Sequence, residues 1–192
     1  MEHKLITLLR SATAQIHKDL EALPVSRVIM STGLTVSEYI AYLQKIYTIH
    51  YSIEKDVFPV VAGKIADLEQ RKKTAQIKQD LEALHATVPA EYTFLDAGFH
   101  ANPAFCMGML YVSEGSTLGG QYILKNVQKV LGAEAAHAGS FLNVYSMRTG
   151  SMWKAFMDIL NTYQATLTDA EMQEVAAGAV YGFERTRKIL SE

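Results

Sequence analysis

The segment Asn102–Leu131 reads NPAFCMGMLYVSEGSTLGGQYILKNVQKVL and carries the longest helical pattern in the chain. Asn102 suits the N-cap of a helix, and Pro103 suits its first turn, where the missing N–H has no partner to lose. Apolar residues recur at helical spacing along the segment, at Phe105, Met109, Val112, Leu118, Ile123 and Val127. The pattern predicts one long helix with an apolar face.

Four glycines interrupt this predicted helix, namely Gly108, Gly115, Gly119 and Gly120. Each costs about 1 kcal/mol relative to alanine in a helix interior, so the four together forgo roughly 3–4 kcal/mol of helix stability. Because glycine lacks Cβ, its backbone can lie directly against another object. The glycines favour close packing against a neighbouring helix, and a flat ligand is the alternative.

The other parts of the chain also show helical patterns. Residues 5–23 have apolar side chains at helical spacing, and a capping box of Thr35 and Glu38 starts a second helix that runs to about Phe58. Pro59 is expected to break or kink that helix. Residues 63–86 are highly charged with a thin apolar stripe, which predicts a solvated helix on the outside of a bundle. Within that range, the charges of residues 71–73 (Arg, Lys, Lys) are expected at the surface.

Two connections and two further helices complete the chain. Residues 87–101 predict a loop or short helical turns, and residues 132–150 predict a longer connection. A helix opening at Ser151 follows, and a second capping box of Thr168 and Glu171 starts the last one. No sustained alternation of polar and apolar residues predicts a strand. The fold class is therefore all-α, a helical bundle of about six to eight helices in a single domain over residues 1–192.

The composition is that of an ordinary soluble globular protein, with 192 residues, 49% hydrophobic, 20% charged and a formal net charge of −2. The charge gives no basic field for nucleic acid or membrane lipid, so neither is expected as a partner. Cys106 is the only cysteine, which suits a reducing compartment. No signal peptide or membrane span is recognised, and the expected location is the cytoplasm.

One histidine has a carboxylate positioned behind it. Glu21 follows His17 by one helical turn, where it can accept from one ring nitrogen and leave the other free to bind a metal. Taken alone, such a histidine is more often a structural residue than a ligand. His50, flanked by Tyr47 and Tyr51, is interpreted as a core or rim residue. The common motifs for nucleotides, zinc proteases, paired cysteines and di-iron bundles are absent.

Two segments resemble one known family. LRSATAQIHKDLE, residues 9–21, resembles the proximal helix of the heme oxygenases, and LYVSEGSTLGGQYILK, residues 110–125, resembles their distal helix in its bacterial form. The resemblance implies a heme-oxygenase-like bundle in which heme, with its iron, is both substrate and cofactor. It also implies cleavage of heme to biliverdin, CO and ferrous iron, with O2 and an electron donor such as ferredoxin or an NAD(P)H-dependent reductase.

The resemblance also assigns roles to individual residues. It implies that His17 is the iron ligand and that Glu21 hydrogen-bonds to it. Gly115, Ser116 and Gly119 would form the catalytic distal side of the heme, with Gly120 beside them. The remaining contacts to heme would come from Arg10, near the propionates, and from Thr13, in the pocket lining.

The chain departs from the family pattern at two places. Ser116 stands where the animal enzymes carry an aspartate that orders water for proton delivery, and a serine supplies no carboxylate. The stretch from Trp153 to Asp158 lacks the family's arginine for the propionates. Weak substitutes for that arginine are Arg148, Lys154 and Arg185.

Three functions are therefore compared. The first is a heme oxygenase with His17 as the iron ligand, served by an acidic electron donor that would dock at Lys18, Lys125 and Lys129. The second is a heme-binding carrier or sensor without catalysis, motivated by Ser116. The third is a bundle of the same fold that acts on another small molecule.

Overall fold

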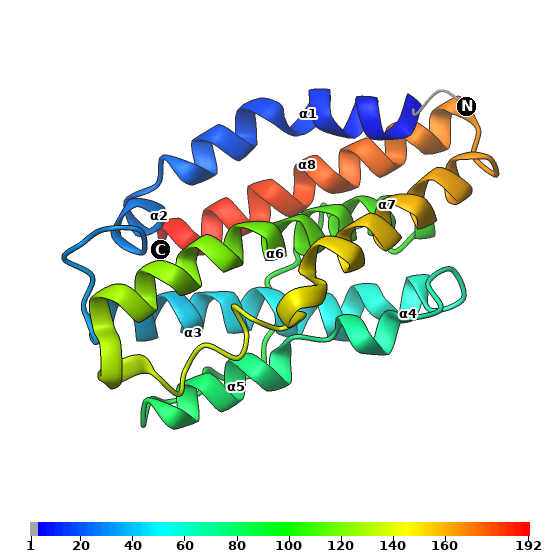
Figure 1. The fold of residues 1–192 in the computed structure, drawn as a ribbon. Helices are drawn as coiled ribbons and strands as arrows, with labels where there is room; N and C mark the ends of the chain where they lie inside the picture. The colour runs from blue at the N-terminus through cyan, green and yellow to red at the C-terminus, as the bar shows by residue number, and fades with distance from the viewer. Residues whose placement is uncertain (1–3) are drawn as a thin grey trace.

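The computed structural model describes residues 4–192, and within that range every regular element is helical. This confirms the predicted all-α class. The α-helices are α1 (Lys4–Glu21), α2 (Pro24–Val28), α3 (Val36–Ser52), α4 (Phe58–Val61), α5 (Thr74–Ala83), α6 (Pro103–Leu131), α7 (Thr149–Gln164) and α8 (Asp169–Ser191) (Figure 1). None of the helices in residues 4–192 combines the length and the apolar character that crossing a bilayer requires.

Helix α6 is the predicted long helix, and its observed bounds confirm the prediction. The Asn102 side chain accepts a hydrogen bond from the Phe105 N–H at 2.8 Å, which caps the first turn. The helix ends at Gly132, whose φ of 53° lies in the left-handed region that favours glycine. Helix α6 packs against α8, α7, α3 and α4, so most of the bundle is arranged around it (Figure 1).

The backbones of α6 and α8 lie directly against each other. A Cβ atom built on Gly108 would lie 1.9 Å from the Val175 carbonyl oxygen, and one built on Gly178 would lie 1.9 Å from the Phe105 carbonyl oxygen. Both distances are far below any real contact, so the two backbones touch only because both residues lack a side chain. At Gly108, the glycine pattern therefore reflects close helix packing.

Helix α3 begins and ends for local reasons. The Thr35 and Glu38 capping box is present, as predicted. Ahead of Pro59 the α-helical pattern changes to a π-helical turn, Ile53–Val57, in which the Phe58 N–H donates to the Ile53 carbonyl. A proline cannot donate to the carbonyl four residues earlier and its ring crowds that carbonyl, so the wider turn accommodates Pro59 without ending the rod.

The charged segment 63–86 is not the single solvated helix that its pattern predicts. Only Thr74–Ala83 forms an α-helix, preceded by a 3-10 turn at Leu68–Arg71. Arg71 and Lys73 are each 1% exposed, whereas Lys72 between them is exposed. The prediction of a surface charge cluster is wrong for these two residues, because the buried carboxylate of Glu114 binds both side chains and Asp67 also pairs with Arg71.

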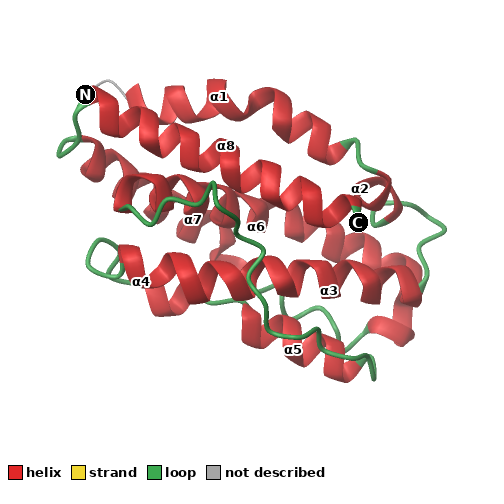
Figure 2. Cartoon of the chain, turned by 180° about the vertical axis from the view of Figure 1, so that it is seen from behind, coloured by secondary structure: helices red, strands yellow, loops and turns green. Residues whose placement is uncertain are grey.

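Two connections are tied to the bundle by side chains. The loop between α5 and α6 crosses α3 on the face seen in Figure 2, where the Phe94 N–H donates to the Ser52 hydroxyl at 2.9 Å. The connection between α6 and α7 is held by Asp80, which is fully buried and accepts from the N–H groups of Ser140 and Phe141 at 2.9 and 2.8 Å. These bonds fix the loops against the helices.

Candidate functional site

A cavity of about 520 Å³ lies between α1, α3, α6 and α8. Trp153 of α7 and Phe94 of the loop between α5 and α6 are also in its wall. A cavity of this size suits a ligand of cofactor dimensions. Its lining is mainly apolar, which suits a ligand with a large apolar surface. The structure thus brings together residues that are about 100 positions apart in the sequence. The predicted site residues in the lining are Arg10, Thr13, His17, Glu21, Gly115 and Ser116.

His17 presents its ring to this cavity. Its side chain is 56% exposed, and the Phe183 ring of α8 lies against it edge-on with 5.6 Å between ring centres. The distance from His17 Nδ1 to the nearer Glu21 oxygen is 3.5 Å, which is longer than an ordinary hydrogen bond. Glu21 is therefore near enough to orient the ring through one nitrogen after a small side-chain movement, while the other nitrogen stays available.

The glycines of α6 differ from one another in what surrounds them. A Cβ atom on Gly115 would make ordinary contact with Trp153 at 3.5 Å, and one on Gly120 would approach the Leu142 carbonyl at 3.4 Å. A Cβ atom on Gly119 would meet nothing within 4 Å. Gly119 and Gly120 do not belong to the cavity lining, so their role toward a ligand stays a prediction. No packing among residues 4–192 explains why position 119 is a glycine.

Ser116 is in the lining, but its hydroxyl already has a partner. The Ser116 Oγ atom donates to the Ser113 carbonyl at 2.7 Å, one turn earlier in α6. The hydroxyl oxygen can still accept a hydrogen bond from a ligand or a water molecule. Ser116 thus provides the cavity with a polar acceptor and no charge.

Sequence reasoning missed Tyr111, which lines the cavity together with Arg10 and Thr13. Burial raises the pKa of Tyr111, and the nearby Arg10 and Thr13 act in the opposite direction. A guanidinium and a phenol in one wall can hold an anionic group. The only sequence signal was the position of Tyr111, one helical turn before Gly115.

The substitutes suggested for the missing arginine lie elsewhere. Lys154 pairs with Asp158 at 2.8 Å on the surface, and Arg185 bonds to the Phe94 carbonyl and to Asp96. Arg148 is exposed. None of the three cationic side chains lines the cavity. The arginine and lysine side chains that do line the cavity are Arg10 and Lys18, and both belong to α1.

His50 is the second histidine of the cavity wall and is only 4% exposed. Its ring packs against Phe141 with 5.3 Å between ring centres. Burial lowers the pKa of His50 well below its usual value, and the positive charge of Lys73 lowers it further. His50 is therefore neutral at pH 7, and the interpretation of a buried core residue agrees with its position.

A pH-dependent stability follows from His50. Below about pH 6.5 the unfolded chain protonates this histidine while the folded protein does not, so stability falls as the pH decreases. One such group contributes a slope of up to about 1.4 kcal/mol per pH unit. We expect His50→Gln to remove that slope, measured by urea unfolding between pH 5 and pH 7. His137→Gln, at an exposed histidine, is the matched control. Equal slopes for wild type and His50→Gln would contradict this expectation.

Comparison with known proteins identifies a matching family and several similar structures. The sequence model of the family described as heme oxygenase matches residues 3–192. The heme oxygenase of Leptospira interrogans is similar in structure, with a TM-score of 0.79, 20% identity and coverage of 97% of this chain and 98% of that one. The NO- and CO-bound heme oxygenase of Neisseria meningitidis gives a TM-score of 0.75, 23% identity and coverage of 97% and 89%.

Heme oxygenase-1 of the cyanobacterium Synechocystis, solved in complex with heme, gives a TM-score of 0.75 at 14% identity and coverage of 97% and 90%. At these identities the likeness establishes the fold. No curated protein sequence gave a significant match.

Proposed function

This chain belongs to the heme oxygenase family, and from that premise we propose that it binds heme in the cavity of α1, α3, α6 and α8 and cleaves it. The proposed products are biliverdin, CO and ferrous iron, formed with O2 and electrons from a separate donor. Heme supplies the iron that activates O2 and the ring that is opened. The protein's own residues bind, orient and shield that group.

The observation that carries the proposal is the position of His17. Its ring lines a cavity of cofactor size, and Glu21 lies 3.5 Å from its Nδ1 atom, which supports a role for the Nε2 atom as the iron ligand. A neutral imidazole is a common iron ligand in heme proteins. Phe183 limits the tilt of the ring from the α8 side. We therefore assign His17 as the metal ligand and Glu21 as the residue that orients it.

Helix α6 would contact the face of the heme ring that is opposite His17. Gly119 weakens the helix by about 1 kcal/mol without a packing reason, and a flat ligand lying against the backbone would supply one. Gly115, which is in the cavity lining, would let the same ligand approach the helix closely. Ser116 would accept a hydrogen bond from ordered water, in place of a carboxylate.

The acidic side chains of heme suit the α1 wall of the cavity. Arg10 provides a permanent positive charge, and Tyr111 provides a hydroxyl donor beside it. Thr13, which is buried, completes this polar corner. Lys18 is also in the lining and is exposed, so it offers a positive charge to which an acidic electron donor would dock. Lys125 and Lys129 would extend that approach along α6.

The cytoplasm remains the proposed location. Cys106 is a buried free thiol, and burial raises its pKa to about 12, so it is a packing residue with little thiolate at neutral pH. As the only cysteine in the sequence, it has no partner for a disulfide within this chain.

One assay tests the proposed function. One equivalent of hemin is added to the protein, and a reductant is supplied in air with catalase present to remove free peroxide. We expect the heme absorption to decay into the spectrum of a bilin. If heme binds but persists unchanged, the carrier or sensor reading replaces the enzyme, and Ser116 is the residue that favours it. If micromolar heme does not bind at all, the cavity serves another small molecule.

A further inference from the structure

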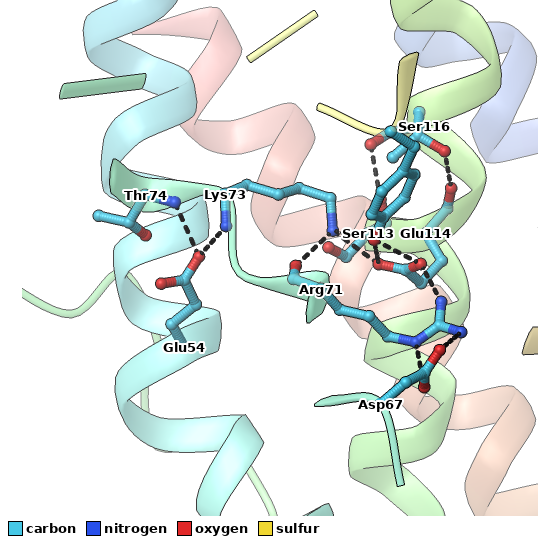
Figure 3. A network of polar contacts seen from close by, with 10 residues as sticks. Glu54, Asp67, Arg71, Lys73, Thr74, Ser113, Glu114 and Ser116 are labelled. Carbon is cyan, nitrogen blue, oxygen red and sulfur yellow. Dashed lines mark hydrogen bonds and ion pairs between the residues drawn. The ribbon is translucent and has the colours of Figure 1, made fainter. Parts of the chain in front are cut away.

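A buried cluster of charged and polar side chains surrounds Glu114, the residue that immediately precedes Gly115 in α6. Arg71, at the end of the 3-10 turn, Lys73, just before α5, and Glu114, in α6, are members of this cluster (Figure 3). The fourth member is Tyr145, in the connection to α7. The Lys73 Nζ atom lies 2.6 Å from Glu114 Oε1, and the Tyr145 hydroxyl lies 3.0 Å from both Glu114 oxygens. Arg71 donates to Glu114 Oε2. Glu114 is therefore held by three side chains from two separate parts of the chain.

The cluster is balanced in charge. Arg71 also pairs with Asp67, with hydrogen bonds of 2.8 and 2.9 Å, so two cations face two carboxylates. Glu114 is 2% exposed, and Arg71 and Lys73 are 1% exposed. Charges removed from water in this way persist only where each has a partner. Glu54 completes the arrangement by accepting from the backbone N–H groups of Lys73 and Thr74 at 2.5 and 2.8 Å.

Glu114 connects the cluster to the cavity, because it is the member of the cluster that belongs to α6. Glu114 is followed by Gly115 and Ser116, both in the cavity lining. The glycines at 115, 119 and 120 have no side chains to anchor this part of the helix. Between residues 113 and 121, side-chain bonds from α6 to other elements come from Glu114 and from Gln121, which donates to the Leu142 carbonyl at 3.0 Å. The orientation of the segment therefore depends on them.

We propose that Glu114 is the positioning residue of this segment. Clamped by Arg71, Lys73 and Tyr145, it sets the rotation of residues 113–121 about the axis of α6, beyond the point where Gly108 holds the helix against α8. That rotation decides where the Gly115 backbone and the Ser116 hydroxyl stand in the cavity, and hence which edge of a bound ring is presented to them. The consequence for heme rests on the proposed function, but the placement of the helix is a property of the protein without ligand.

The test uses a double variant that keeps the charges balanced. Lys73→Met with Glu114→Gln removes one cation and one anion and leaves Arg71 paired with Asp67. The single change Glu114→Gln would leave two buried cations with one carboxylate and is prone to misfolding. Hydrogen exchange in the ligand-free protein is measured for the amides of residues 113–121. We expect exchange about tenfold faster there in the double variant, because local opening costs less.

The second readout is the product. With heme and reductant, wild type is expected to give one predominant bilin isomer and the double variant a mixture, since ring orientation is no longer fixed. Asn126→Ala is the matched control, because it removes two 3.0 Å bonds from α6 to the Ile29 and Ser31 carbonyls outside the cavity. It should lower stability with the isomer ratio unchanged.

The possible outcomes separate this inference from the proposed function. Unchanged exchange at residues 113–121 in the double variant overturns the positioning role, and so does an unchanged isomer ratio in an active enzyme. If wild type makes no bilin, the proposed reaction fails, and the exchange measurement alone then supports or overturns the placement of α6.

Discussion

Replacing His17 with alanine is expected to remove the histidine-ligated heme spectrum and to lower bilin formation by at least about 100-fold. Loss of a residue that merely orients a metal ligand costs 10–100-fold, so loss of the ligand itself should reach or exceed that range. Hemin is added to wild type and to His17→Ala, and the Soret band and the rate of bilin formation are measured. Added imidazole should restore part of the spectrum by occupying the vacated space.

The control for this variant is His137→Ala, at an exposed histidine outside the cavity. It should match wild type in both spectrum and rate, which separates loss of the ligand from loss of any histidine. A His17→Ala protein with an unchanged heme spectrum and full turnover would contradict the assignment of His17 as the iron ligand. Partial binding without ligation would still be expected, because the apolar lining and Arg10 remain.

Gly108→Ala is expected to destabilise the fold by about 3 kcal/mol, measured by urea unfolding. The new Cβ atom would lie 1.9 Å from the Val175 carbonyl oxygen and 2.6 Å from the Ala179 nitrogen, and both are backbone atoms of α8 that cannot rotate away. Helices α6 and α8 would have to separate. The gain in helix propensity, about 1 kcal/mol, offsets only part of this cost.

The same substitution at Gly119 is the matched control within the same helix. A Cβ atom there meets nothing within 4 Å, so Gly119→Ala should raise stability by up to about 1 kcal/mol. Opposite signs at the two glycines would confirm that packing, and not helix propensity, requires the one at 108. Equal destabilisation at both positions would contradict this account.

Much of the fold was predictable because helix boundaries are local. The Asn102 cap, the two capping boxes and Pro103 are read from neighbouring residues, and the structure has helices beginning at each of them. The 63–86 segment was mispredicted because its charges looked like those of a solvated helix. The buried carboxylate that pairs with both charges, Glu114, is far away in the sequence, so no local pattern reveals that Arg71 and Lys73 are buried.

The candidate site shows the same division. His17 and Glu21 are one turn apart, and the glycine segment is continuous, so both could be found in the sequence and matched to a family. The roles of Tyr111 and His50 depend on which helix faces which, and this becomes visible only when α1, α3, α6 and α8 surround one cavity.

By itself, the sequence determined the helical class, the position of α6 and the pairing of His17 with Glu21, because helical periodicity and capping act over a few residues. Only the tertiary structure decided which glycine serves which purpose: Gly108 lies against the α8 backbone, whereas Gly119 faces open space. The tertiary structure also brings Glu114 of α6 together with Arg71, Lys73 and Tyr145. The physical reason is that burial and charge pairing arise between elements distant along the chain, so they are settled by packing and not by local propensity.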